Sequence, residues 1–294
     1  SSALGFTRNN VLQAGNLSFR NKLINGDFQV WQRGTSFTDP TGVSTSYCAD
    51  RWSVYRSGWV SGITSSKQTT SFTNSNSLRA QRNSGNASTS PLIIVQNIET
   101  LEAKKLAGKY VTLQFKALCG ANYSGGTATV TIYTGTGTDE NIITGYTGTA
   151  TPLSTAFTPT TSAQTFTFTA NIASGVKELA VYITYTPSGT AGAADYLEIT
   201  DVQLEEGTVS TPFERRSYGT ELALCQRYYY RIFPGAISKV LIFGCNINAT
   251  LHRGVVKFPV PMRIAPTALE QSGTAGNYNV CLLYTSPSPR DATL

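Results

Sequence analysis

Residues 111–117 read VTLQFKA, and the alternation in this stretch decides the fold class. Every second residue, from Val111 to Ala117, is apolar, whereas Thr112, Gln114 and Lys116 lie between them. A period of two is typical of an antiparallel strand that places one face on a core and the other in solvent. The stretch is therefore predicted to be a half-buried β-strand.

The same alternation returns along the chain at 128–132, 165–169 and 179–185. Segments rich in Gly, Thr, Pro and Ser separate these stretches, and the best helical pattern, 99–107, is short and stops at Gly108. Many short strands without long intervening helices are typical of sandwiches and jelly rolls. We therefore predict an all-β chain: a jelly-roll β-sandwich followed by a small, truncated β-rich domain.

Composition excludes several classes of protein. Charged residues make up 14% of the chain, against roughly 25% in average soluble domains, which argues against a mostly helical or an acidic disordered protein. No apolar run approaches the ~18 residues of a membrane span, so we expect no membrane insertion. The single His252 rules out His-based dyads and multi-His metal sites within one chain. No helix-turn-helix, RNP or finger pattern accompanies the +6 net charge, so we expect no nucleic-acid partner.

The pattern changes along the chain predict four segments. Residues 1–21 are expected to be a linker, 22–217 the sandwich, and 218–280 an incomplete C-terminal domain with apolar strands at 240–243 and 255–260. Residues 281–291 read CLLYTSPSPRD, which resembles the translation of a transposon-type sequencing adapter. We therefore expect 281–294 to be an adapter-derived artefact and leave it out of the fold prediction.

The stretch 196–204 contains an irregularity. Leu197 and Ile199 share one face, but Val202 and Leu204 fall on the opposite parity. A β-bulge at Thr200–Asp201 would restore both pairs to the core. Without a bulge, Asp201 would point inward and would need a cation or hydrogen-bond donors.

Parts of the chain resemble proteins of phage tails. The opening and closing parts of 22–217 resemble jelly-roll carbohydrate-binding modules of phage tail fibres, and two later segments resemble the region that follows in receptor-binding proteins. The segments are LINGDFQVWQRG (23–34) with DRW (50–52), ITDVQLEEGTVSTPFERR (199–216), ELALCQRYYY (221–230) and KFPVPMRIAP (257–266). This resemblance implies a non-catalytic adhesin in the virion tail, assembled in the host bacterial cytoplasm. It would act as a homotrimer that binds host cell-surface polysaccharide.

The resemblance also implies a structural calcium ion between the first and last strands. Asp201 matches the ligand in the last strand, but Gln29 occupies the place of the expected Glu. A neutral amide in place of a carboxylate removes a hard anionic ligand. No cofactor is expected to be required; if calcium is bound, Asp201 and Asp27 are the candidate ligands.

Aromatic side chains are the candidate sugar platforms, because the apolar faces of sugars stack on rings while polar groups bind the hydroxyls. Trp31 and Trp52 lie at core parity and are predicted to be packing residues. The candidates are Trp59, which follows Gly58, with Tyr55, Tyr123 and Tyr146.

Two other functions remain open. The adjacent acidic pairs Asp139–Glu140 and Glu205–Glu206 would point to opposite faces of a strand and so cannot flank one glycosidic bond. There is no GxSxG motif and no P-loop. Carboxylates from distant strands could still make the chain a capsule-degrading fibre enzyme (a depolymerase). The other alternative is a carbohydrate-binding module of a bacterial secreted glycanase.

Overall fold

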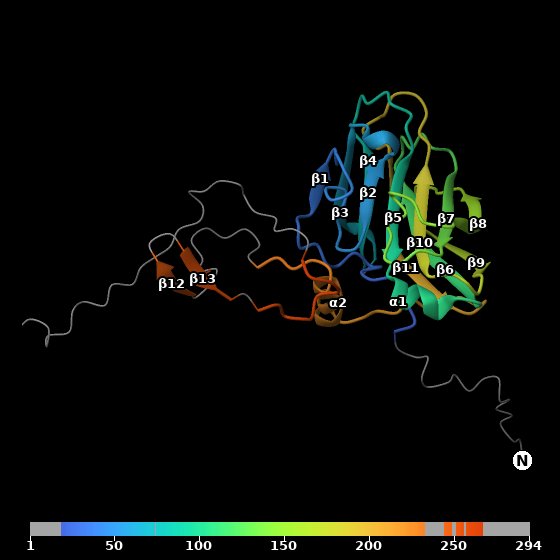
Figure 1. Cartoon of the computed structure of the whole chain (residues 1–294). Helices are drawn as coiled ribbons and strands as arrows, with labels where there is room; N and C mark the ends of the chain where they lie inside the picture. Colours follow the sequence, from blue (N-terminus) through green and yellow to red (C-terminus); the bar gives the residue numbers. More distant parts are fainter. Residues whose placement is uncertain (1–18, 74, 233–243, 249–250, 256, 267–294) are drawn as a thin grey trace, which may run out of the picture. The chain divides into compact units, whose positions relative to one another are not determined.

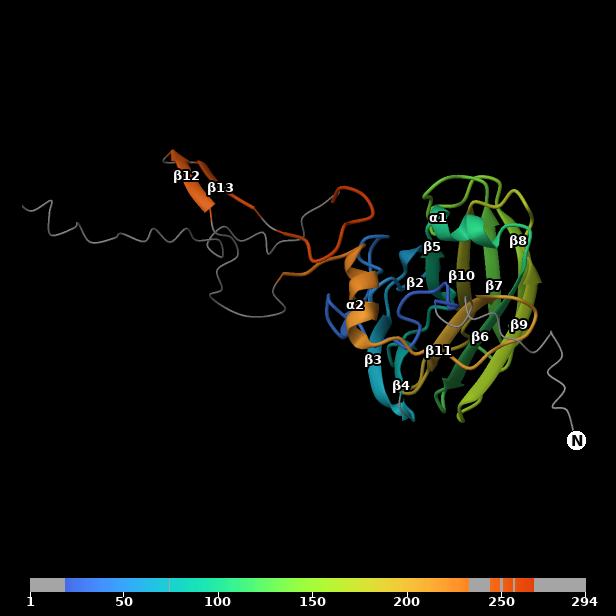
Figure 2. The ribbon, with the colours of Figure 1, turned by 90° about the horizontal axis from the view of Figure 1, so that it is seen from below.

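The computed structural model describes residues 19–73, 75–232, 244–248, 251–255 and 257–266. Two antiparallel sheets face each other in this part of the chain, as Figures 1 and 2 show from two directions. The six-stranded sheet contains, in spatial order, β1 (Ser36–Thr38), β3 (Ile63–Phe72), β4 (Ser75–Arg82), β11 (Tyr196–Glu206), β6 (Tyr110–Cys119) and β9 (Gln164–Asn171). The five-stranded sheet contains β2 (Ser53–Arg56), β5 (Leu92–Ile98), β10 (Glu178–Tyr185), β7 (Ala128–Gly135) and β8 (Ala150–Phe157). This arrangement confirms the predicted all-β jelly-roll sandwich.

The core lies between the sheets and uses the apolar parity of each strand. In β6, Val111, Leu113 and Phe115 are all 0% exposed. The Phe115 ring meets Phe157 of β8 edge-on, with ring centroids 5.2 Å apart. Trp52 is also fully buried, which confirms its predicted packing role.

The first turn of the sandwich is held by side-chain hydrogen bonds. Residues 23–31 alternate like a strand but, although all are described, they form no strand. Asn25 has a φ of 59°, and its side chain donates to the carbonyls of Val30 and Asp50 at 2.8 and 3.0 Å. These side-chain bonds satisfy backbone groups that a strand would have paired with a neighbour.

The two ends of the sandwich meet at this turn. The Val202 amide donates to the carbonyl of Gly26 at 2.9 Å. A Cβ at position 26 would lie 2.1 Å from the Val202 carbonyl oxygen, so only glycine permits this approach.

β11 contains the predicted bulge. Its pairing with β6 shifts register between Thr200 and Gln203, and Asp201 has a φ of 50°. The shift places Ile199 and Val202 on the core side, and both are 0% exposed.

Short helical segments accompany the sheets. The predicted helix at 99–107 appears as α1 (Thr100–Ala103) continued by η4 (Lys104–Leu106). The longer helix is α2 (Tyr218–Gln226), whose N-cap is Ser217. Ser217 caps because its side chain accepts a hydrogen bond from the Thr220 amide.

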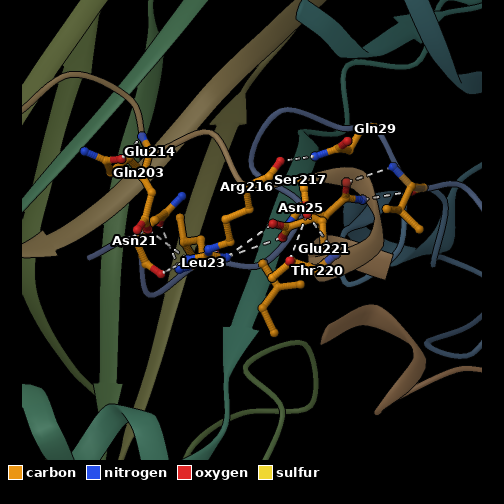
Figure 3. Close-up of polar contacts among 12 residues, drawn as sticks. Asn21, Leu23, Asn25, Gln29, Gln203, Glu214, Arg216, Ser217, Thr220 and Glu221 are labelled. Atoms are coloured by element: carbon orange, nitrogen blue, oxygen red, sulfur yellow. Dashed lines mark hydrogen bonds and ion pairs between the residues drawn. The ribbon is translucent and has the colours of Figure 1, made fainter. Parts of the chain in front are cut away.

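α2 is tied to the first turn of the sandwich by a buried polar network, drawn in Figure 3. Glu221 is 4% exposed and accepts a hydrogen bond from the Asn25 amide. The Arg216 guanidinium lies 3.4 Å from Glu221 and donates to the Leu23 carbonyl at 3.2 Å. Asn21 completes the network by donating to the Val202 carbonyl at 2.9 Å. The polar exit after β11 is therefore an integral part of the sandwich.

The chain divides into two compact units, 1–261 and 262–294, and the predicted limits at 217 and 280 stay predictions. Beyond α2, the described residues contain one antiparallel pair, β12 (Gly244–Asn248) with β13 (Leu251–Gly254). Three predictions concern segments wholly or mostly outside the described residues: the strand at 240–243, the adapter-like 281–294 and the linker at 1–21.

The strand predicted at 255–260 is wrong, since its described residues form none. Pro259 lacks an amide that a ladder would need. No helix in the described part of the chain is long and apolar enough to cross a membrane.

Candidate functional site

The outer face of the five-stranded sheet carries a second apolar cluster, separate from the core. It arises because β5, β7 and β10 place apolar residues at the outward parity as well as at the inward one. Its buried members are Tyr55, Ile93, Val95, Tyr146 and Ala180, and its partly exposed members are Trp59, Tyr133, Ile142, Ile143 and Tyr182.

Strand register arranges three tyrosines of this cluster in a diagonal band. Tyr133 of β7 pairs with Ala180 of β10, two residues before Tyr182 on that strand. Tyr55 of β2 pairs with Ile93 of β5, which in turn pairs with β10 at Thr184, two residues after Tyr182. The band thus crosses four neighbouring strands, a reach of about 14 Å across the sheet at ~4.8 Å per strand. We call Tyr55, Trp59, Tyr133 and Tyr182 the aromatic band.

The rings of the aromatic band contact one another in two pairs. Tyr55 and Trp59 have ring centroids 4.8 Å apart, and Tyr133 meets Tyr182 edge-on at 5.3 Å. Tyr55 and Tyr182 are also joined by a hydrogen bond between their phenols. Burial raises the pKa of both phenols, so they remain protonated donors at neutral pH.

The backbone turns Trp59 back over the sheet. η3 (Ser57–Trp59) follows β2, and both Gly58 and Trp59 have left-handed φ values, 73° and 56°. A positive φ is uncommon for a bulky side chain and is found mostly where structure or function requires it. Here it seats the Trp59 ring against Tyr55 at the edge of the band.

Segment 136–149, the connection from β7 to β8, borders the band. It is drawn in light green and lies on the outer side of the five-stranded sheet in Figures 1 and 2. Asn97 of β5 holds it: the amide nitrogen donates to Asn141 at 2.9 Å. The Asn97 oxygen accepts from the Ile142 amide and the Tyr146 phenol at 2.9 and 2.8 Å.

The structure brings three of the four sequence-predicted sugar platforms together. Tyr55, Trp59 and Tyr146 belong to this cluster, but Tyr146 is 6% exposed and serves to fasten the loop to Asn97. Tyr123 lies elsewhere, with its ring 4.9 Å from that of Tyr185 at the edge of the core. Its phenol is buried and has no hydrogen-bond partner among the described residues.

Sequence reasoning did not select Tyr182 or Tyr133. A signal was present, because both have the parity opposite to the core residues of their strands. Tyr182 stands between Val181 and Ile183, which are both 0% exposed. An aromatic residue at an outward position is the pattern that would have identified them.

The candidate calcium ligands lie away from the aromatic band, with Asp201 on β11 of the six-stranded sheet and Asp27 in the first turn. The Asp201 carboxylate is 2% exposed and faces Lys116 Nζ at 2.9 Å and Arg215 Nη2 at 3.3 Å. Burial, the largest cause, raises the pKa of nearby Asp27, and the charge of Arg215 opposes that rise. In the described chain no three His, Cys, Asp or Glu residues gather as metal ligands do. A carboxylate already paired with two protein cations does not fit a calcium site.

The acidic pairs of the sequence do not converge. Glu205 is buried and accepts from the amide of Thr211 at 2.7 Å, whereas Glu206 pairs with Lys109 at 2.7 Å. Glu140 accepts from the Thr147 amide and hydroxyl, and these hydrogen bonds lower its pKa.

No protein-family model and no curated protein matches the chain. Solved structures similar to it include a CBM4 structure, with 17% identity, a TM-score of 0.39, and coverage of 62% of this chain and 98% of that one. A carbohydrate-binding module of the β-sandwich superfamily shows 8% identity and a TM-score of 0.38, covering 60% of this chain and 63% of that one. The enzymatically active domain of tailspike protein 4 of bacteriophage CBA120 shows 11% identity and a TM-score of 0.38, covering 64% of this chain and 22% of that one. These likenesses concern the β-sandwich architecture alone.

Proposed function

We propose that the aromatic band binds a glycan of the host cell surface without cleaving it. The observation that carries this proposal is that Trp59, Tyr133 and Tyr182 are partly exposed on one face of one sheet. Contiguous apolar surface of this kind marks binding sites more often than it occurs by chance on a monomer.

The chemistry of the face suits a sugar chain. Rings stack on the apolar C–H faces of pyranoses, and hydroxyl donors and acceptors beside the rings bind the sugar hydroxyls. Thr129 of β7 pairs with Thr184 of β10, two residues after Tyr182. Both threonines are half-buried and lie on the outward side of their strands. Ser154 of β8 lies next to Thr131 and is exposed. The face thus combines rings with hydroxyls.

The carboxylates of this face favour binding over hydrolysis. Glu178, which shares the outward parity of Tyr182, is 0% exposed and accepts a hydrogen bond from Thr100 at 2.6 Å. Glu140 is engaged by Thr147. Glycoside hydrolysis needs two carboxyl groups that flank one bond, whereas Glu178 is closed to solvent and Glu140 is held by Thr147.

The biological setting that we propose is the tail of a phage virion. The sequence resemblance of 23–34 and 199–216 to tail-fibre modules supports it. In that setting the protein is assembled in the bacterial cytoplasm and works as a homotrimer, and its partner is host polysaccharide.

The test is an array of bacterial capsular and O-antigen polysaccharides, followed by affinity measurement on the best ligand. Trp59→Ala and Tyr182→Ala should each weaken binding at least tenfold, because stacked aromatics are typical hot spots. Tyr110→Ala is the matched control, since Tyr110 is 53% exposed on the other sheet and should be neutral. Wild-type affinity in both band variants would overturn the proposal.

Incubation with the bound polysaccharide separates adhesin from enzyme. We expect no increase in reducing ends over a buffer control. A steady release that survives purification would identify a depolymerase instead.

A further inference from the structure

A cluster of charges on the outer face of the six-stranded sheet surrounds Asp201. The bulge turns this residue out of the core and beside β6. Its carboxylate, 2% exposed, contacts Lys116 Nζ at 2.9 Å, Arg215 Nη2 at 3.3 Å and the Ser75 hydroxyl at 3.1 Å. All of these contacts come from groups that donate hydrogen bonds to a carboxylate.

In the neighbouring first turn, a carboxylate is likewise compensated by cationic side chains. Lys67 donates to the Gln29 carbonyl at 3.2 Å, and the charge of Asp27 acts on Lys67. Arg215 acts on Asp27 as well as on Asp201. The carboxylates of Asp201 and Asp27 are therefore compensated by three cationic side chains, those of Lys116, Arg215 and Lys67. The Gln29 carbonyl oxygen already accepts a hydrogen bond from Lys67.

These charges oppose a divalent cation. A calcium site collects anionic and neutral oxygens around the ion, and its ligands carry an excess of negative charge. Here an added cation would displace or face Lys116 and Arg215. The buried Asp201 carboxylate nevertheless needs positive charge beside it, because burying an unpaired carboxylate costs free energy of folding.

Arg215 is the unusual partner because it belongs to the exit from the sandwich rather than to a strand. Its guanidinium also donates to Ser75 of β4 at 3.0 Å. One side chain thus links β4, the bulge of β11 and the chain that leads into α2.

We propose that Lys116 and Arg215 neutralise Asp201 in place of a metal ion, so that the closing of the sandwich depends on the exit segment and not on calcium. The chain after β11 supplies the charge that holds the bulge against the first turn. The sandwich and the start of the following region are thereby coupled.

The first test is the thermal unfolding of the full chain, followed by tryptophan fluorescence because all three tryptophans lie before residue 60. Melting temperatures in 5 mM CaCl2, 5 mM MgCl2 and 5 mM EDTA should agree within ~1 °C. A site filled a hundredfold above its Kd would raise the melting temperature by more than about 5 °C. A calcium-specific rise of that size would overturn the proposal.

The second test is a double-mutant cycle at low salt. Arg215→Gln should lower the melting temperature by a few degrees in the wild-type background, and by much less in an Asp201→Asn background, since the charge to be neutralised is gone. Lys116→Gln should show the same dependence on Asp201. Lys109→Gln breaks the exposed pair with Glu206 and serves as the control, with a shift within ~1 °C. Additive effects of Arg215→Gln and Asp201→Asn would contradict the pairing.

These results are independent of glycan binding. Trp59→Ala should leave both melting tests unchanged, so the failure of either proposal can be recognised separately.

Discussion

The two outer faces of the sandwich are built by the same alternation and differ in chemistry. The five-stranded sheet turns tyrosines outward, whereas the six-stranded sheet turns out charged and polar residues such as Glu198, which pairs with Arg79 at 2.9 Å. A period of two requires only that one side of each strand be apolar, and the strands of both sheets meet this requirement. The outward residues are therefore where the two sheets specialise.

The six-stranded face is also partly covered by its own chain. Gln203 accepts from the Glu214 amide at 2.7 Å, and Glu205 accepts from the Thr211 amide at 2.7 Å. Both side chains are nearly fully buried, at 0% and 3% exposure, yet have partners. This face thus anchors the exit segment, and the aromatic face remains available for a ligand. Substitutions on the first should affect stability, and substitutions on the second should affect binding.

The largest expected effect is on the anchoring side. Arg216→Ala would leave Glu221, 5% exposed at its side chain, without its cation. Breaking a buried ion pair costs about 3–5 kcal/mol, which lowers the melting temperature by at least ~6 °C. Calorimetry should detect the loss, and glycan affinity well below the melting temperature should be unchanged.

A second substitution checks the cause of that loss. Arg216→Ala combined with Glu221→Gln should recover part of the stability, because the uncompensated charge is removed. Lys105→Ala, at a 60% exposed position, is the neutral control. If Arg216→Ala melts like the wild type, the exit segment does not anchor the sandwich and the contrast between the faces fails.

A smaller effect is expected on the binding side. Asn97→Ala removes three hydrogen bonds that hold 136–149, and should cost about 1–3 kcal/mol of unfolding free energy in urea. Faster amide exchange at Ile142 should accompany it. Glycan affinity should fall by up to about tenfold, since the loop borders the aromatic band.

Asn141→Ala is the graded control, because it keeps the two bonds that the Asn97 side-chain oxygen accepts. It removes the 2.9 Å bond from the Asn97 amide nitrogen and the 3.0 Å bond from the Ile143 amide. Unchanged exchange at Ile142 in Asn97→Ala would mean that other contacts position the loop.

The smallest effect is a dependence on pH. Burial raises the pKa of Asp27 above its usual value of 3.8, so the folded state binds this proton more tightly than the unfolded state. Stability from this group is therefore greatest below the unfolded pKa and declines as pH rises towards the folded pKa. In Asp27→Asn the melting temperature should therefore fall less than in the wild type as the pH rises above 3.8.

Glu206→Gln, on an exposed carboxylate, should leave that slope unchanged. An identical slope in Asp27→Asn would show that other acids, such as Glu221 with its pKa also raised by burial, govern the profile.

The sequence alone determined the features that depend on near neighbours. Strict alternation identified the strands around Val111, Val130 and Val181 and their core sides, and a phase slip located the bulge at Asp201. These predictions succeed because the parity of a strand and its interruption are local properties of the chain.

Tertiary structure alone decided which residues meet. Residues 23–31 alternate in sequence but form a turn, because the Asn25 side chain binds backbone carbonyls there. Tyr182 contacts Tyr55, which lies on a strand more than a hundred residues away in sequence. Asp201 acquired cations from β6 and from the exit segment. Such contacts depend on strand order and register, which pair residues distant in sequence and leave no periodic signal in it.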